Sequence, residues 1–525
     1  MKKCSLIKCT ALAFAALMLA ACGAPAASAE GGGAGQASAS AEAVQYKHGW
    51  DLGKEVNLKM FLLGDKAADF DLVYGKINEE LKKQINTTLE VEFLSWAEHD
   101  AKYSLLFSSG EEFDLIFTGT GWAHYEPTAT KMGFYEMTDD FRRQYAPDIM
   151  SFMPEDAWEH AKISGKVFMV PNYNIEIDYS LLGLRGDLME KYGFSDIAST
   201  EQLEAFFDAI CENEEGISPL GTQGLALQWI YLIQQHELAA LKSLQPLFLY
   251  HYTEPENIEV VSIVERPEFR EYARKMKEMQ TKGYWSKDAL STTDTRTDNF
   301  IQGRAASMGW TLGNIVTACV QMNADHPDWK ATFADITPQF SKPSQPYSNN
   351  GMAINAISKN PERSMITINE LMTNKTTWDL ACYGIDGVHY QAVGDDRYIP
   401  LADSSRYPAF ANGNWGWTNE PFKRKLYSET PDPLITKQEE TTEKWNASVA
   451  AGNPLITFSM NEEVVKSQIA VINTLITQYM DPISTGLVDD PDAAVDEFLL
   501  KLNEAGLQEV HLEMQKQADA WAAEH

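Results

Sequence analysis

The sequence predicts an α/β protein of two lobes, each built on a mainly parallel sheet flanked by helices, followed by a helical C-terminal part. Strand and helix patterns alternate at the start of the folded region, which is typical of this class. Later segments have the pattern of a chain that leaves one lobe and returns to it. After a low-complexity N-terminal segment about 480 residues remain, which is long enough for two or more lobes.

The N-terminus has the features of an export signal that ends in a lipidation site. A lysine-rich start precedes an apolar run from Thr10 to Ala21, which is too short to span a bilayer. The run ends in Leu-Ala-Ala-Cys22, which matches the bacterial lipobox, so we expect acylation of Cys22; an ordinary secretory signal containing a cysteine is the alternative. Gly, Ala and Ser dominate residues 23–42 and predict a flexible tether.

Charge and cysteine content exclude several kinds of partner. The net charge of -32 becomes -35 once the three lysines of the signal are removed, which argues against nucleic acid, anionic membrane surfaces and strongly anionic solutes. The folded part keeps Cys211, Cys319 and Cys382, enough for one disulfide at most, and buried free thiols are the favoured interpretation. No cysteine pair has metal-site spacing, so we expect neither a metal nor a cofactor.

The first elements predict a parallel sheet with right-handed crossovers. Apolar residues alternate in a strand over 56–62, recur every four residues in a helix over 71–85, and alternate again around 89–93. A helix around 101–107 and a short apolar strand over 113–117 follow. Ligands bind beyond the carboxyl ends of such strands, so the loops that follow them are candidate site segments.

Further along, caps and hydrophobic spacing predict the remaining elements. They are a hairpin strand over 165–171, helices over 187–192, 199–210, 269–280 and 361–372, strands over 333–338 and 351–355, and C-terminal helices over 491–502 and 507–521. The acidic run at 489–492 has two interpretations, a calcium site or a helix cap at Asp490, and the cap is simpler. The predicted organisation is a signal over 1–22, a tether over 23–50, a first lobe over 51–175, a second lobe over 176–348, a return to the first lobe over 349–410, and a helical C-terminal region over 411–525.

Several segments together resemble family 1 extracellular solute-binding proteins, which have the periplasmic-binding-protein type II fold. The resemblance is carried by the lipobox, the tether, the strand at 56–62, and residues 165–171, 185–188, 300–306 and 353–355. Residues 383–390, 502–507 and 513–517 resemble DUF3502, a domain of unknown function, although Asp386 stands where that family usually has Glu.

The resemblance implies a function in transport. It implies a monomeric protein held by lipid on Cys22 at the extracytoplasmic face of the bacterial cell membrane. This protein would capture a carbohydrate, as an oligosaccharide, by lobe closure and deliver it to the permease subunits of an ABC transporter. Two other functions stay open: a sensor or adhesion module on the same fold, and a secreted glycoside hydrolase, for which the sequence has abundant acids but no GxSxG, HExxH or P-loop motif.

A sugar site needs flat aromatic rings for the apolar face of the sugar and planar polar groups for its hydroxyls. The aromatic candidates are Trp96, Trp122, Trp229, Trp310, Trp415 and Trp417, and the polar candidates are Asp65, Glu98, Asn174, Asn349, Asn350 and Asp386. Some of them have a structural alternative: lobe packing for Trp122 and Trp310, core packing for Trp229, a subdomain contact for the pair at 415 and 417, and turn formation for Asn349 and Asn350.

Overall fold

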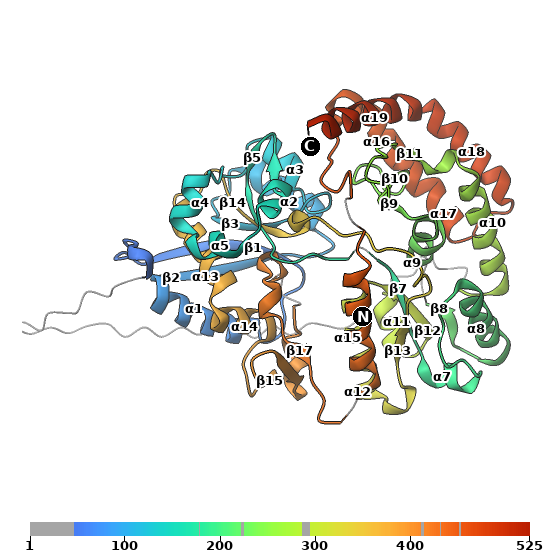
Figure 1. Cartoon of the computed structure of the whole chain (residues 1–525), viewed down its shortest axis with the longest axis horizontal. Coiled ribbons are helices and arrows are strands. Elements are labelled where there is room, and N and C mark those ends of the chain that lie inside the picture. The colour runs from blue at the N-terminus through green and yellow to red at the C-terminus, as the bar shows by residue number, and fades with distance from the viewer. Residues whose placement is uncertain are drawn as a thin grey trace, which may run out of the picture. The chain divides into compact units, whose positions relative to one another are not determined.

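The computed structural model describes residues 47–177, 179–221, 225–285, 295–410, 414–430, 432–450 and 453–524 (Figure 1). Cys22, the signal and most of the predicted tether lie outside these residues. Within the described part of the chain, no helix is both long enough and apolar enough to cross a membrane.

The first sheet begins as the sequence predicts. Strand β1 (Val56–Leu63) runs parallel to β2 (Thr87–Leu94) and β3 (Leu115–Thr118), and helices α1 (Phe70–Ile85) and α2 (His99–Ser109) connect them. The apolar side chains spaced four residues apart on α1 are buried, which is why this segment forms an amphipathic helix against the sheet. The predicted strand–helix–strand–helix–strand start is confirmed.

The first sheet is completed by strands from later in the chain. Its order is β2-β1-β3-β14-β6, with β6 at Met169–Pro171 and β14 at Gly351–Ile354. β14 is antiparallel to both neighbours, so this sheet is mixed, with parallel pairing limited to the opening strands. The hairpin of β4 (Lys162–Ile163) and β5 (Lys166–Val167) precedes β6.

The second sheet differs from the mainly parallel arrangement predicted for both lobes. Its order is β13-β7-β12-β8, with β7 at Leu181–Leu184, β8 at Ser218–Leu220, β12 at Ala305–Trp310 and β13 at Thr332–Ala334. β7 is antiparallel to both β12 and β13, and β8 with β12 is the parallel pair. The reason is that the strand by which the chain enters this sheet runs opposite to the strands on either side of it.

Helices and small sheets surround the two main sheets. Around the first sheet lie α3 (Tyr125–Thr130), α4 (Asp139–Tyr145), α5 (Pro147–Phe152), α6 (Glu155–His160), α13 (Pro361–Thr373), α14 (Lys375–Tyr383), and the sheet of β15 (Tyr390–Val393), β16 (Arg397–Pro400) and β17 (Lys425–Leu426). With the second sheet are α7 (Gly186–Lys191), α8 (Thr200–Asn213), α9 (Leu225–Gln228), α10 (Pro267–Lys282), α11 (Arg296–Ile301), α12 (Leu312–Asp325), and the sheet of β9 (Leu238–Ala240), β10 (Phe248–His251) and β11 (Val261–Ser262). The C-terminal helices are α15 (Pro433–Ala447), α16 (Lys466–Leu475), α17 (Asp481–Ser484), α18 (Pro491–Glu504) and α19 (Leu507–Glu524).

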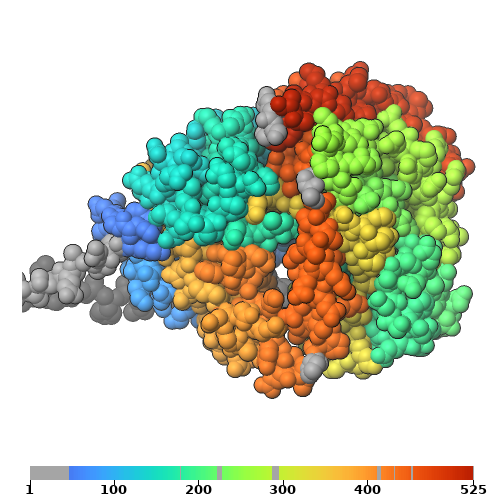
Figure 2. All heavy atoms as spheres, viewed as in Figure 1, coloured from blue at the N-terminus to red at the C-terminus, as the bar shows by residue number. Residues whose placement is uncertain are grey.

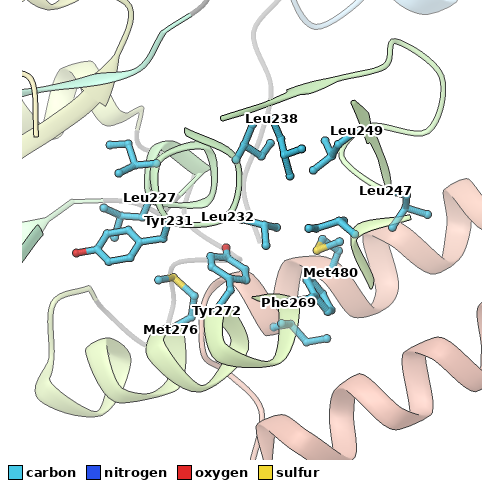
Figure 3. Packing of buried hydrophobic residues seen from close by; sticks show 14 of the residues in the cluster. Leu227, Tyr231, Leu232, Leu238, Leu247, Leu249, Phe269, Tyr272, Met276 and Met480 are labelled. Carbon is cyan, nitrogen blue, oxygen red and sulfur yellow. The ribbon is translucent and has the colours of Figure 1, made fainter. Parts of the chain in front are cut away.

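The C-terminal helices pack into the core of the second lobe. Phe269 and Tyr272 of α10 share a buried cluster with Met480 and with Phe498 of α18, and Figure 3 shows the contact between α10 and the Met480 segment. In Figure 2 the same helices, in red, lie against the green surface of the second lobe. The predicted region 411–525 therefore divides between two cores, because Trp417 belongs to the buried cluster of the first lobe.

Two segments that link the sheets lie side by side. The chain passes from the first sheet to the second between β6 and β7 and returns between β13 and β14. The backbone N–H of Gln345 in the returning segment donates to Glu176 O in the outgoing one at 2.8 Å, and Ile177 pairs with Ser344. A third link, which the sequence analysis did not predict, runs from β17 to α15, which packs against α12.

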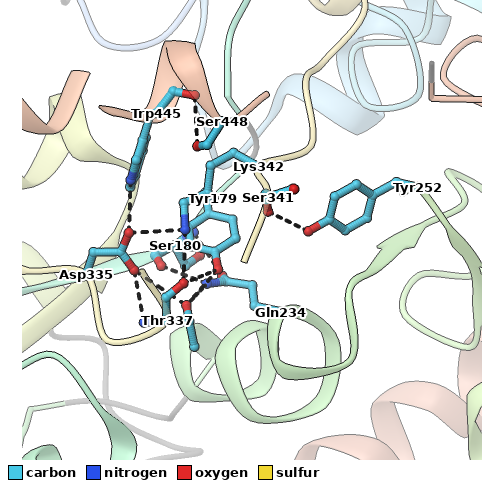
Figure 4. A network of polar contacts seen from close by, with 10 residues as sticks. All are labelled: Tyr179, Ser180, Gln234, Tyr252, Asp335, Thr337, Ser341, Lys342, Trp445 and Ser448. Carbon is cyan, nitrogen blue, oxygen red and sulfur yellow. Dashed lines mark hydrogen bonds and ion pairs between the residues drawn. The ribbon is translucent and has the colours of Figure 1, made fainter. Parts of the chain in front are cut away.

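A buried ion pair fastens the returning segment to α15 (Figure 4). Lys342, with a side chain only 1% exposed, places Nζ 3.2 Å from Asp335 Oδ2 and 3.8 Å from the ring centroid of Tyr179. The same carboxylate accepts a 2.9 Å hydrogen bond from Trp445 Nε1 of α15. Burial lowers the pKa of Lys342, and the neighbouring carboxylate acts in the opposite direction.

Local sequence signals behave largely as expected. Asp490 accepts hydrogen bonds from the backbone N–H groups of Asp492 and Ala493, so it caps α18. The three cysteines in the described residues are free thiols. Cys319 and Cys382 are buried as the sequence predicts, whereas Cys211 is exposed, because it faces outward on α8.

Candidate functional site

Three of the predicted tryptophans come together from distant parts of the chain. The ring centroids of Trp96, Trp122 and Trp415 are separated by 5.7 to 6.4 Å, and their planes lie within 19° of one another. Since the three separations are nearly equal, the rings form a triangle and not a column, in which the outer two would be about twice as far apart. We call these three side chains the tryptophan platform.

The platform is open to solvent to different degrees. Trp96 is 59% exposed and Trp122 is 37% exposed, whereas Trp415 is partly buried. Trp415 packs edge-on against Phe117 of β3 at 4.2 Å between centroids, which anchors the platform to the core. The exposure of two large aromatic rings is unusual for a position with only a packing role, so the platform is a candidate binding surface.

The loop after β3 holds Trp122 in place. Trp122 Nε1 donates a 2.8 Å hydrogen bond to Asn349 O in the segment before β14. This close approach depends on Gly119, because a Cβ atom there would lie 2.3 Å from Asn349 O and 2.8 Å from Trp122 Nε1. Gly119 was not among the predicted site residues, and its role follows from the fold of the loop.

Trp417 has a different position from its neighbour Trp415. It is fully buried in the core of the first lobe, and its indole Nε1 has no hydrogen-bond partner among the described residues. A single residue, Gly416, separates the two tryptophans on one short helical turn, Asn414–Trp417, and only Trp417 is fully buried. Trp417 therefore has no ring face free for a solute, and the alternative of a packing role describes it.

Polar side chains border the loops that carry the platform. Glu98 accepts a hydrogen bond from Ser95 and pairs with Lys102 at 2.8 Å, and these partners lower its pKa, Lys102 most strongly. Asp65 is exposed in the loop that follows β1. Glu98 therefore keeps a negative charge near Trp96 that can accept hydrogen bonds from hydroxyl groups.

The remaining asparagines meet at one carboxylate in the linking segments. Glu176 accepts from Asn349 Nδ2 at 2.9 Å, from Asn174 Nδ2 at 3.2 Å and from Asn350 Nδ2 at 3.5 Å. The sequence analysis missed Glu176, although its alternation with Asn172 and Asn174 is visible in the sequence. Asn349 thus joins Glu176 to Trp122, which connects the platform to both linking segments.

A cavity of about 200 Å³ lies in the second lobe, beside the linking segments. It is lined by Tyr179, Ser180, Trp229, Ile233, Gln234, Leu238, Ala239, Tyr252, Arg296, Trp310, Thr311 and Pro343. Two of the predicted tryptophans are therefore in one cavity. Trp229 begins a π-helical turn, Trp229–Ile233, a distortion that often marks functional sites.

A half-buried arginine, Arg296, forms part of one wall of the cavity. The Arg296 guanidinium lies 4.3 Å from the ring centroid of Trp310 and donates to Gly309 O at 3.1 Å. Burial lowers the pKa of Arg296, which still leaves it cationic. Arg296 was not predicted, and the signal that points to it is the cation stacked on an aromatic ring.

Asp386 has a structural position in the turn before β15. It is exposed, and its Oδ1 accepts the backbone N–H of Ala392 at 2.9 Å, which stabilises the turn. A shorter acid is sufficient for this contact. Nothing in the described residues brings Asp386 into contact with the platform or the cavity.

The platform loop approaches the second lobe at Lys242. A Cβ atom at Gly121 would lie 2.4 Å from Cδ of Lys242, in the loop that follows β9. Lys242 Nζ in turn donates to the side chain of Gln345 in the returning segment at 3.0 Å. The loop before Trp122 therefore touches both the second lobe and the segment that links the lobes.

Comparison with known proteins supports the fold. Residues 454–523 match the family described as Domain of unknown function (DUF3502). The chain is 26% identical over 482 residues to a carbohydrate ABC transporter substrate-binding protein of Streptococcus pneumoniae serotype 4, covering 90% of this chain and 92% of that protein.

Two solved structures extend the comparison. The N-glycan transport solute binding protein NgtS from Streptococcus pneumoniae matches with a TM-score of 0.73 and 23% identity over 90% of this chain and 99% of that chain. The same protein in complex with Man5GlcNAc matches with a TM-score of 0.69 and 22% identity, also over 90% and 99%. The predicted resemblance is confirmed for the fold, because the chain has the two-lobed type II fold of extracellular solute-binding proteins. It is also confirmed for the motifs at 502–507 and 513–517, which lie within the DUF3502 match, whereas the motif at 383–390 lies outside that match.

Proposed function

We propose that this protein is the extracytoplasmic solute-binding component of an ABC importer and that it captures an oligosaccharide. The tryptophan platform carries the proposal, because three nearly parallel indole rings from distant segments gather with their centroids within 6.4 Å, and two of them are exposed to solvent. The S. pneumoniae relatives, a carbohydrate ABC transporter substrate-binding protein and an N-glycan transport protein, favour the same substrate class.

The chemistry of the platform suits a sugar. The C–H groups on one face of a pyranose ring pack against an indole, and burial of that apolar surface supplies the binding free energy. Three rings about 6 Å apart offer more flat surface than one sugar ring covers, which favours a chain of sugars over a monosaccharide. Glu98, two residues after Trp96, and Asp65, in the loop after β1, are carboxylates that can accept hydrogen bonds from hydroxyl groups.

The cavity of the second lobe is the second half of the proposed site. Trp229 and Trp310 supply further aromatic surface there, and Tyr179 and Tyr252 add ring faces. A solute that contacts both the platform and the cavity would stabilise the closed arrangement of the lobes, with the linking segments as the hinge. In that arrangement the permease subunits would recognise the loaded protein.

The N-terminal segment completes the proposal. Acylation of Cys22 would hold the protein at the membrane, and the Gly/Ala/Ser tether would keep the binding domain close to its permease, which raises its effective concentration there. We also propose that the protein has no catalytic activity, since the proteins it resembles are described as binding proteins.

The experiment is a thermal-shift screen of the purified protein against monosaccharides, neutral oligosaccharides and short peptides. A ligand that binds only the native state raises the melting temperature, by an amount that grows with its concentration above Kd. We expect oligosaccharides to raise it and the corresponding monosaccharides to raise it less. A shift produced by peptides and by no carbohydrate would contradict the sugar assignment.

A further inference from the structure

A cluster of metal-ligating side chains lies next to the tryptophan platform. Among the described residues, His99, Asp100 and His124 each offer one ligand atom, and these atoms lie within 4.8 Å of one another. His124 Nε2 is 3.1 Å and His99 Nδ1 is 3.4 Å from Asp100 Oδ1. The sequence predicts no metal site, because 24 residues separate Asp100 from His124 and no known ligand spacing is present.

These separations fit a small cation. Ligand atoms about 2.0–2.1 Å from one tetrahedral metal ion lie about 3.3 Å from each other, which is close to both measured distances. Asp100 is 89% exposed and His124 is 22% exposed, so a fourth ligand position can be taken by water. Lys102, the nearest lysine along α2, is paired with Glu98, which leaves the Asp100 carboxylate to the two histidines.

His99 is the buried member of the cluster, only 5% exposed. Its Nδ1, the ring nitrogen that lies 3.4 Å from Asp100 Oδ1, is the atom that can bind the cation.

We propose that His99, Asp100 and His124 bind a divalent transition-metal cation such as Zn²⁺. Two imidazoles and one carboxylate select this class over Ca²⁺ or Mg²⁺, which prefer sites made of oxygen ligands. The cation ties the start of α2, three residues after Trp96, to the loop before α3, two residues after Trp122. It thereby fixes two members of the platform relative to each other, a consequence that rests on the proposed function.

The test is titration of the full chain, stripped of metal with EDTA, with ZnCl₂ in a calorimeter and with CoCl₂ in a visible spectrometer. We expect one Zn²⁺ per chain and cobalt d–d bands of a four-coordinate site. Two variants remove a ligand with little change of shape: Asp100→Asn, and His124→Asn, since asparagine tolerates the positive φ of 59° at that position. Each is expected to weaken Zn²⁺ binding at least about tenfold.

The control is His326→Ala, which removes an exposed histidine next to Asp325 on another part of the surface. It should leave Zn²⁺ binding unchanged. Absence of Zn²⁺ binding by the unmodified chain, or equal binding by His124→Asn when circular dichroism shows it to be folded, overturns the proposal. Oligosaccharide shifts measured in parallel keep the two proposals separate: a sugar shift without any Zn²⁺ binding overturns only the metal site, and Zn²⁺ binding without any sugar shift overturns only the proposed function.

Discussion

Truncation of Trp96 to alanine should weaken solute binding without unfolding the protein. The side chain is 59% exposed, which for a tryptophan leaves about 150 Å² of ring and stem open to a ligand. A stacked sugar covers one face, about half of that area. At about 25 cal/mol per Å², the contact contributes about 2 kcal/mol, or about thirtyfold in Kd.

The assay is isothermal titration calorimetry with the best oligosaccharide of the thermal-shift screen. The matched control is Leu512→Ala, which removes an apolar side chain that is 70% exposed on α19. Both variants should change the free energy of unfolding by less than about 1 kcal/mol, because both side chains are mostly exposed. A Kd for Trp96→Ala within twofold of the unmodified protein would refute the role of the platform.

Three further predictions concern the loop that holds Trp122, the exposed cysteine and the buried ion pair between Asp335 and Lys342. Gly119→Ala should displace Trp122 and weaken oligosaccharide binding, and the added Cβ should lower the free energy of unfolding by about 1–3 kcal/mol. A melting temperature equal to that of the unmodified protein would contradict this. Cys211 should be the fastest to react with iodoacetamide of the three cysteines described, because it is the exposed one. Its reaction should be faster at pH 9 than at pH 7, since desolvation raises the pKa of its thiol and keeps it protonated at pH 7; peptide mapping by mass spectrometry measures both. Asp335→Asn should lower the free energy of unfolding, measured with urea, by about 3–5 kcal/mol, because it leaves the Lys342 ammonium buried without its counter-ion. Adding Lys342→Met should recover part of that loss. A double variant less stable than the single one would contradict the account.

Much of the fold follows from local patterns. The alternation in 56–62 and the four-residue spacing in 71–85 each depend on one face that must be buried, so β1 and α1 are readable from the sequence. The antiparallel direction of β7 is not readable in this way, because a short strand buried on both faces has the same pattern in either direction. The packing of the C-terminal helices against α10 likewise depends on contacts between segments far apart in the chain.

The site was predictable only in part, because local sequence patterns do not show which distant segments come together. Glycine-rich loops with exposed tryptophans indicated Trp122 and Trp415, but their parallel arrangement with Trp96 depends on the tertiary fold. Trp417 has almost the same sequence context as Trp415, and the direction of one short helical turn decides which of them is buried. Glu176 was missed because its importance lies in amide donors from the returning segment.

The most direct test of the central claim is calorimetric titration of the purified protein with a series of neutral oligosaccharides of increasing length. The account predicts saturable one-to-one binding that tightens from the monosaccharide to the longer members, as successive rings cover the platform of Trp96, Trp122 and Trp415. Absence of binding by every carbohydrate in the series, together with saturable binding of a peptide, would contradict it.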